Sequence, residues 1–297
     1  MEKIKFGGWK NCYKLSNNMV DLIVTGDVGP RIIHFGFVNN TNILKTFPEQ
    51  LGKTKQDQWI VFGGHRLWHT PEDINRTYYP DSNPVVVEET EKGLKVTQEI
   101  EPTTGIEKSI EIKLHEEKAT VNLLHTIKNC GIWPIETSAW ALSVLAAGGT
   151  AIIPLPPRGP HPDFILPTSS LTLWPYTDLS DERWEFGEKY IRVKQNESVG
   201  KPQKIGVHSS EGWLAYLNNS QLFIKQVDYE NCQEYPDMGS NLEIFVDGEI
   251  LELETLSPIR KIEPGERIIH EEVWKLIKNV PEIKNDKDVL DYVLPHL

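Results

Sequence analysis

The sequence predicts an all-β protein, an antiparallel sandwich or barrel, with one short helix at its C-terminus. Three observations support this fold class. Apolar and polar residues alternate with period two along much of the chain, turn residues separate many of the alternating runs, and convincing helical periodicity is scarce. Short strands spaced about 8–12 residues apart are typical of sandwiches and barrels.

Individual strands are expected where the alternation is clearest. In IEIKLH, Ile110, Ile112 and Leu114 alternate with charged or polar residues, as in a strand with one buried face. The segment LEIFVDGEILELET contains two alternating runs around Asp247-Gly248, a strong hairpin signal. Further strands are expected at 19–25, 31–38, 85–90, 93–100, 117–128, 204–209, 221–228 and 267–276.

The remaining segments divide into one helix and two long loops. The tail NDKDVLDYVLPHL starts with Asn and Asp and spaces its apolar residues as a helix does. Residues 45–84 and 154–187 look loop-rich, and loops longer than about 12–15 residues in a compact domain are usually functional or disordered. Their aromatic residues and prolines favour ordered, functional loops. No repeat or composition shift appears, so residues 1–297 are expected to form a single domain.

Composition limits which binding partners and which cellular locations are expected. The chain has 31 Lys and Arg against 43 Asp and Glu, a formal charge of −12, which disfavours nucleic acid and anionic membrane surfaces as partners. Its three cysteines are far apart and suggest neither a disulfide framework nor a zinc ribbon. No apolar leader or 18-residue apolar run is present, so a cytoplasmic location is expected. P-loop, Rossmann and nucleophile-elbow motifs are also missing.

Two glutamates share one face of the expected strand LELET. Residues two apart in a strand point to the same side, so Glu252 and Glu254 lie opposite Leu251 and Leu253. This pattern fits a solvated outer face or a functional pair of carboxylates. Just upstream, YPDMGSNLEIF supplies further polar groups near this strand, although Pro-Asp-x-Gly is also ordinary turn chemistry. The polar side chains of that segment are Tyr235, Asp237, Asn241 and Glu243.

The segment FGGHRLWHTPE concentrates groups that can bind a ligand. His65 and His69 have the H-x-x-x-H spacing of half a zinc site, but the flanking glycines and proline leave little room for a helix. A loop that grips a carbohydrate fits better, because Trp68 offers a flat apolar face and Arg66 offers hydrogen-bond donors. Packing of the same residues in the core is the alternative. The nearby NRTYYPD adds Arg76, Tyr78 and Tyr79.

A third cluster, PPRGPHPD, contains Arg158, His161 and Asp163 on a proline-rich backbone. Proline fixes the backbone and so places these side chains rigidly. Rigid placement suits a binding site and a plain connector equally well.

Four segments resemble the aldose 1-epimerases, or galactose mutarotases. LELETLSP resembles the L-E-T-Q strand of that family, whose glutamate is the catalytic base and corresponds to Glu254. FILPTSSLTLWPYTDLSD, PGERIIHEEVWKL and GDVGPRIIHFGF resemble three further family segments spread over most of the chain. The resemblance implies a galactose mutarotase-like β-supersandwich of large twisted antiparallel sheets, in an uncharacterised divergent branch.

The chain departs from the family at its general acid. Where the family has a mid-chain histidine, SAWALSVLAAGG places Trp140 or a neighbour. His65 is the nearest analogue of the family's other substrate histidine. His65 and, second, His161 are therefore the candidates for the proton donor.

These observations predict a protein that binds a small sugar or sugar derivative and interconverts its anomers by acid–base catalysis, without metal or organic cofactor. The alternatives are a non-catalytic carbohydrate-binding or sensing protein and a glycoside-active enzyme that uses the paired glutamates. The expected substrate-binding residues are Arg66, Trp68, His69, Arg76, Tyr78, Asn241, Glu243 and Glu252.

Overall fold

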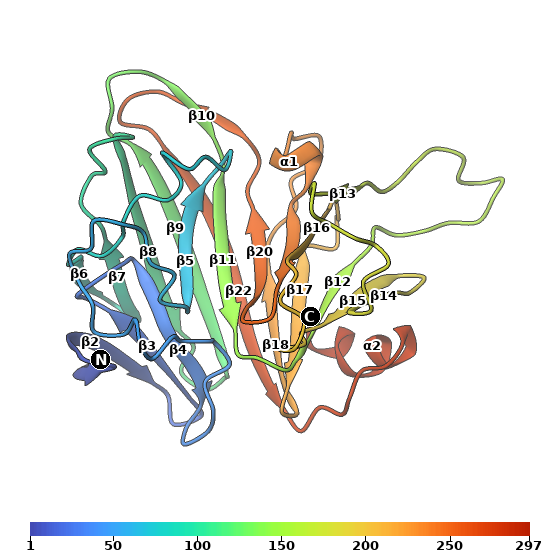
Figure 1. Ribbon diagram of the computed structural model, residues 1–297, viewed down its shortest axis with the longest axis horizontal. Coiled ribbons are helices and arrows are strands. Elements are labelled where there is room, and N and C mark those ends of the chain that lie inside the picture. Colours follow the sequence, from blue (N-terminus) through green and yellow to red (C-terminus); the bar gives the residue numbers. More distant parts are fainter.

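A computed structural model describes all residues 1–297 and shows two large antiparallel sheets packed face to face (Figure 1). We call them sheet I and sheet II. Sheet I has the strand order β1-β2-β3-β4-β5-β11-β20-β19-β16-β13, and sheet II has the order β14-β15-β12-β17-β18-β22-β9-β8-β7-β6. The two-stranded sheet β10-β21 completes the β-structure. The predicted all-β class is confirmed.

The strands of sheet I come from both halves of the chain. They are β1 (Glu2–Phe6), β2 (Trp9–Ser16), β3 (Val20–Thr25), β4 (Arg31–Phe37), β5 (His65–His69), β11 (Ala139–Leu145), β13 (Leu171–Leu173), β16 (Gln203–Val207), β19 (Leu242–Val246) and β20 (Leu251–Leu256). The β19–β20 hairpin forms around Asp247-Gly248 as predicted, with Glu243 directly opposite Glu254.

Sheet II covers one face of sheet I. Its strands are β6 (Val86–Thr90), β7 (Gly93–Thr97), β8 (Ile106–Leu114), β9 (Thr120–Asn129), β12 (Thr150–Pro154), β14 (Trp184–Phe186), β15 (Tyr190–Lys194), β17 (Trp213–Asn218), β18 (Gln221–Gln226) and β22 (Arg267–Lys278). The small sheet consists of β10 (Ile135–Thr137) and β21 (Arg260–Ile262).

The two sheets share one hydrophobic core of 39 buried residues. Leu67 of β5 and Leu253 of β20 contribute to it from sheet I, and Ile112 and Trp274 contribute from sheet II. Because side chains alternate along a strand, the neighbours of Leu67 and Leu253 project from the opposite, outer face of sheet I.

Helical structure is short, as predicted. Helix α2 (Asp286–Tyr292) begins after Asn285, whose side chain accepts a hydrogen bond from the Asp288 amide and so caps the helix. Val289 is buried in a second apolar cluster on the outer face of sheet II. The turn α1 (Pro236–Gly239) and the 3-10 turn η1 (Leu294–His296) are the other helical segments. No helix combines the length and the apolar character needed to cross a membrane.

Residues 157–170 form an exposed arm between β12 and β13. Figure 1 shows this arm extending away from the two sheets. His161 lies on it, and Phe164, Ile165 and Leu166 are more than half exposed near its tip.

Candidate functional site

The outer face of sheet I carries a cavity of about 570 Å³. Its floor comes from adjacent strands, because the register places Trp68 beside Trp140 and Arg66 beside Leu142, which in turn lies beside Glu254. Residues from the segment 47–78 and the segment 174–176 form much of the walls. Both of the long segments predicted to be functional therefore contribute to one cavity.

The segment FGGHRLWHTPE is a strand in the middle of sheet I, which corrects the prediction that it is a loop. β5 pairs with β4 on one side and with β11 on the other, and all five of its residues are buried. Gly63 and Gly64 allow the backbone to turn into β5. Both have positive φ, and a Cβ at Gly64 would lie 2.2 Å from the carbonyl oxygen of Ile32. Arg66 and Trp68 face the cavity, as residues two apart in a strand do.

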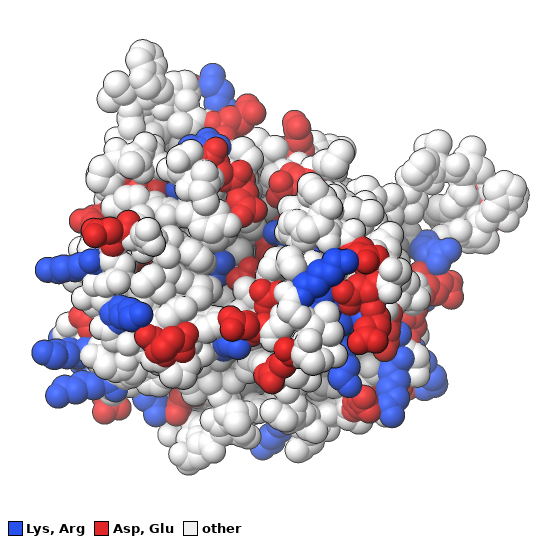
Figure 2. Space-filling view, viewed as in Figure 1, with Lys and Arg blue, Asp and Glu red and all other residues white.

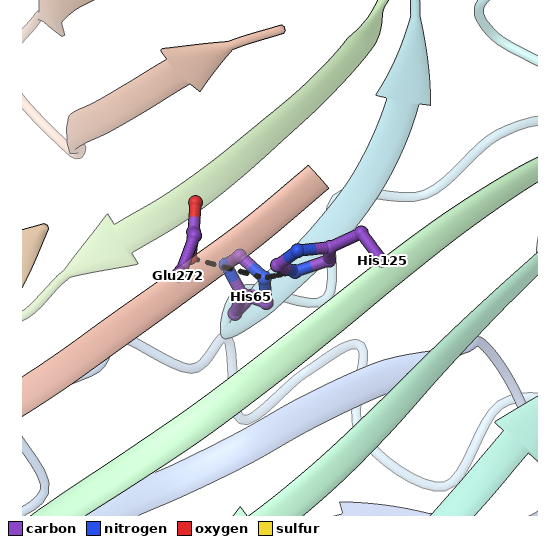
Figure 3. A group of neighbouring side chains, drawn as sticks. All are labelled: His65, His125 and Glu272. Atoms are coloured by element: carbon purple, nitrogen blue, oxygen red, sulfur yellow. Dashed lines mark hydrogen bonds and ion pairs between the residues drawn. The ribbon is translucent and has the colours of Figure 1, made fainter. Parts of the chain in front are cut away.

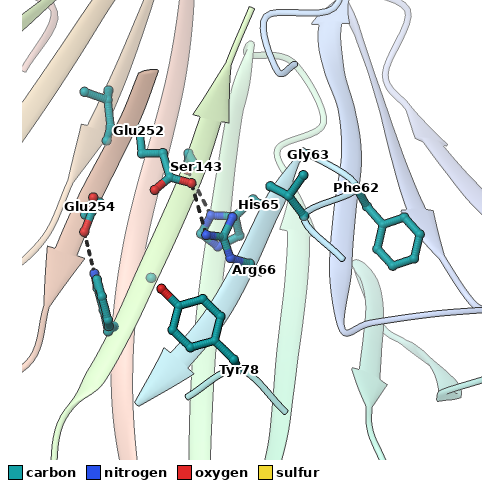
Figure 4. A network of polar contacts seen from close by, with 12 residues as sticks. Phe62, Gly63, His65, Arg66, Tyr78, Ser143, Glu252 and Glu254 are labelled. Atoms are coloured by element: carbon teal, nitrogen blue, oxygen red, sulfur yellow. Dashed lines mark hydrogen bonds and ion pairs between the residues drawn. The ribbon is translucent and has the colours of Figure 1, made fainter. Parts of the chain in front are cut away.

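Two buried contacts between basic and acidic side chains lie across the cavity floor, and Figure 4 shows the one between Arg66 and Glu252. Arg66 Nη2 donates to Glu252 Oε1 at 3.0 Å. Lys204 Nζ, from β16, lies 2.8 Å from both Glu254 Oε2 and Glu243 Oε2. Although burial opposes it, the two carboxylates raise the pKa of the Lys204 ammonium above its ordinary value. Lys204 therefore remains charged and holds the side chains of Glu243 and Glu254 together on neighbouring strands.

Aromatic rings surround these charges. The Arg66 guanidinium lies 4.4 Å from the centroid of the Trp68 ring, and Lys204 Nζ lies 4.6 Å from that of the Trp140 ring, both within cation–π range. Trp140 Nε1 also donates to Glu254 Oε2 at 2.7 Å. The aromatic residues of the cavity wall are Phe47, Trp59, Trp68, Tyr78, Trp140, Trp174, Tyr176 and Phe245.

The cavity floor retains unpaired polar atoms of both kinds. Glu254 Oε1 is a buried acceptor without a hydrogen-bond partner. The other oxygen of the same carboxylate, Oε2, accepts hydrogen bonds from Trp140 Nε1 and from Lys204 Nζ. Arg66 Nε and Nη1 are buried donors without partners. Buried polar groups are nearly always hydrogen-bonded in folded proteins, so these atoms indicate where a ligand would supply the missing partners.

His65 does not face the cavity, which corrects its expected role as the acid. It points to the core side of β5, is fully buried, and contacts Ser143 and His125 through its two ring nitrogens. Burial holds the pKa of His65 well below its ordinary range. A neutral imidazole that no ligand can reach cannot protonate one. None of the twenty residues that line the cavity is a histidine.

His65, His125 and Glu272 form the group that most resembles a metal site (Figure 3). Their ligand atoms lie within 4.8 Å of one another. The two Nε2 atoms, however, are only 2.7 Å apart, the distance of a direct hydrogen bond. Lys225 Nζ lies 3.0 Å from Glu272 Oε1 and already supplies the cation. We therefore describe the group as a buried hydrogen-bond network.

The protons of this network can be assigned from its contacts. His125 Nδ1 lies 3.0 Å from the carbonyl oxygen of His270, which only accepts, so Nδ1 carries the hydrogen. A neutral His125 then accepts at Nε2, and His65 donates from its own Nε2. The Ser143 hydroxyl completes the chain by donating to His65 Nδ1 at 2.9 Å. His65 and His69 share no site, because strand residues four apart lie about 13 Å from each other.

The other predicted residues divide between the cavity and places outside it. Tyr78 and Glu252 line the cavity together with Arg66, Trp68 and Glu254. Five predicted residues do not line it: His69 is buried, Arg76 is exposed beside Asp73, His161 lies on the exposed arm, Glu243 is buried behind Lys204, and Asn241 is buried against Ser209.

Asn241 holds the loop after β16 to the start of β19. Its side chain accepts from the Ser209 amide and donates to the Ser209 carbonyl, both at 2.8 Å. We expect Asn241→Ala to destabilise the fold by about 1–3 kcal/mol, because it leaves both backbone groups unsatisfied. Urea unfolding measures this loss. If Asn241→Ala instead weakened ligand binding without any loss of stability, Asn241 would be a ligand-binding residue after all.

Several cavity residues were not predicted from the sequence as parts of the site, chiefly Lys204, Trp59 and Glu72. Lys204 lies in a strand that the alternation does predict. Its pairing with Glu254 depends on the order of strands in sheet I, which no local pattern encodes.

Solved structures with this architecture come from several bacteria. The protein Slr1438 of Synechocystis sp. PCC 6803 superposes with a TM-score of 0.60 at 11% identity, over 94% of this chain and 100% of that one. A galactose mutarotase-like protein from Lactobacillus casei matches with a TM-score of 0.56 at 10% identity, over 90% and 100%. A galactose mutarotase related enzyme from Lactobacillus acidophilus has a TM-score of 0.56 at 8% identity, over 92% and 99%.

The chain has the galactose mutarotase-like fold. No family model matches the sequence, and no curated protein matches it. The likeness therefore concerns the fold alone, at 8% to 11% identity. On this fold, the glutamate that the sequence resemblance selects lies in the floor of the aromatic cavity described above.

Proposed function

We propose that the protein binds an aldose in this cavity and interconverts its anomers, with Glu254 as the general base. The observation that carries the proposal is Glu254 Oε1, a buried carboxylate oxygen without a partner in an aromatic cavity. The fold of the mutarotase-like neighbours supports it independently.

The cavity matches the chemistry of a sugar. Aromatic faces such as Trp68 and Trp174 pack against the C–H faces of a pyranose ring. Each sugar hydroxyl both donates and accepts hydrogen bonds. The unpaired Arg66 donors and the unpaired Glu254 acceptor are therefore both satisfied by a polyol.

In the proposed reaction, Glu254 Oε1 removes the proton from the anomeric hydroxyl while an acid protonates the ring oxygen. The C1–ring oxygen bond breaks, the aldehyde forms, and rotation about C1–C2 followed by the reverse steps gives the other anomer. Both protons return to their starting groups, so no cofactor takes part.

We assign the acid to Glu252, in place of His65 and His161. Glu252 and Glu254 project from the same face of β20 into the cavity, about 6.6–6.8 Å apart along the strand. Burial raises the pKa of the Glu252 carboxyl, although Arg66 opposes the shift. Two carboxyl groups in different environments are the usual arrangement for an acid and a base.

A non-catalytic carbohydrate-binding protein is the second candidate, favoured by the contacts of Glu254 Oε2. The Lys204 ion pair and the Trp140 hydrogen bond both fix this carboxylate in place, as a binding site requires, without a need for it to exchange a proton.

Exchange NMR of anomer interconversion tests the proposal, with the wild type, Glu254→Gln and the surface control Glu116→Gln. Glu116 pairs only with Lys92 and is 75% exposed. We expect acceleration by the wild type and the control, and a loss of about 10²–10⁴-fold in Glu254→Gln. Equal acceleration by all three proteins contradicts the assignment of the base. Sugar binding without acceleration in any of them selects the second candidate.

A further inference from the structure

The cavity has more negative than positive side chains, which bears on the charge of its ligand. Two cationic side chains, Arg66 and Lys204, line it against five carboxylic ones: Glu72, Asp247, Glu249, Glu252 and Glu254. If Glu252 carries its proton, as proposed above, the lining still has an excess of two negative charges. The surface view shows both charge types in the hollow at the middle of this face (Figure 2).

Both cations are already engaged by glutamates of the floor, although Arg66 keeps two donors without a partner, Nε and Nη1. Arg66 is paired with Glu252 at 3.0 Å, and Lys204 lies between two carboxylates at 2.8 Å. Lys45 lies near the rim, but its ammonium donates to the carbonyl oxygen of Glu249 and packs over the Phe47 ring. A phosphate or carboxylate that used these donors would lie among the five carboxylic side chains of the lining and would meet the unpaired oxygen of Glu254.

The carboxylates, in contrast, have capacity left for a cation. Glu254 Oε1 is buried and unpaired in the floor. At the rim, Glu72 accepts a hydrogen bond only from the Tyr78 hydroxyl. Asp247 Oδ1 accepts hydrogen bonds from backbone amides of its own hairpin. Glu249 is exposed and has no ion pair. An ammonium group has three donors and no acceptor, and it is attracted to aromatic faces as well as to carboxylates.

We propose that the preferred ligand is an amino sugar in its ammonium form, with the amine on the carbon next to the anomeric carbon, so that the nitrogen and the anomeric hydroxyl both reach Glu254 Oε1 while the aromatic walls hold the ring. This inference rests on the proposed function, because it takes the ligand to be a sugar. It predicts that the cavity binds cationic sugars more tightly than neutral ones, and neutral sugars more tightly than anionic ones.

Titration calorimetry with sugars that differ in one substituent tests the proposal. The probes are glucose, glucosamine, N-acetylglucosamine, glucuronate and glucose 6-phosphate. Galactose and galactosamine are added in case the cavity binds only sugars of the galactose configuration. At roughly pH 6.5, where such an amine is charged, we expect the amino sugar to bind about 10-fold more tightly than its neutral parent. The preference is expected to disappear at roughly pH 9, where the amine is neutral.

A charge variant at the rim gives a second readout that does not depend on the base. Glu249→Gln keeps the shape of the exposed rim residue and removes one charge, so it is expected to reduce the ratio of amino-sugar to neutral-sugar affinity about 2- to 3-fold.

The outcomes separate the two proposals. Equal affinity for amino and neutral sugars, or tighter binding of glucuronate or glucose 6-phosphate, overturns the charge selection and leaves the sugar-binding function standing. Binding of no sugar at all overturns both.

Discussion

Replacing Lys225 with methionine is expected to destabilise the protein by about 3–5 kcal/mol, because it leaves Glu272 charged and unpaired between the sheets. Lys225 projects from β18 of sheet II and is fully buried 3.0 Å from Glu272 Oε1. Its ammonium also donates to the carbonyl oxygen of Ala141, in sheet I, at 2.8 Å. Methionine fills a similar volume but supplies neither charge nor donors. Urea unfolding at neutral pH measures the loss.

A surface pair provides the matched control. Lys201 contacts Asp178 at 2.9 Å, with side chains 56% and 42% exposed, so Lys201→Met is expected to cost about 0–1 kcal/mol. Adding Glu272→Leu to Lys225→Met is expected to recover part of the loss, since it removes the unpaired charge. Equal costs for Lys225→Met and Lys201→Met would show that the two sheets do not depend on the buried ion pair.

Acid is expected to unfold the protein, because four buried histidines are neutral in the native state. Burial lowers the pKa of His69 and of His270 to about 3 and also lowers those of His65 and His125. In the unfolded chain each titrates near 6.5, so the stability that they contribute is complete above about pH 6.5 and is lost as the pH falls toward their native values. Each contributes a slope of about 1.4 kcal/mol per pH unit in that window.

Two buried glutamates act in the opposite direction. Burial raises the pKa of Glu243 and of Glu252, so the folded state holds protons that the unfolded state releases above about pH 4.5. The expected net effect is a loss of stability as the pH falls below about 6, smaller than the four histidines alone would give. Denaturant unfolding at a series of pH values measures it.

His69→Gln isolates one histidine. Its Nδ1 has no hydrogen-bond partner, and the residue does not touch the cavity. Removing its titration is expected to flatten the stability curve by about 1.4 kcal/mol per pH unit below about pH 6. A curve parallel to that of the wild type would mean that His69 is protonated in the folded protein.

The sequence predicts the strands whose apolar and polar residues alternate clearly. It does not predict strands that are buried on both faces. The hairpin of β19 and β20 and the capped helix α2 follow from local patterns around Asp247-Gly248 and Asn285. β5 is buried on both faces, so its residues HRLWH show no apolar–polar alternation, and the flanking glycines look like those of a loop. Strand β11 is also buried throughout and was not predicted.

The site shows the same division. The alternation in LELET places Glu252 and Glu254 on one face, and the structure confirms that geometry and adds that both line the cavity. His65 was predicted to reach the ligand but points to the core, because the face of a strand that is buried depends on which sheet packs against it. Lys204 and Glu254 are 50 residues apart, and only the strand order of sheet I brings their charges together.

A crystal structure with a bound sugar tests the central claim most directly. We predict the ring in the cavity of sheet I, packed against the tryptophans, with a hydrogen-bond donor of the sugar within about 2.5–3.2 Å of Glu254 Oε1. A sugar bound elsewhere, or one in the cavity that leaves Glu254 Oε1 without a partner, would contradict the account.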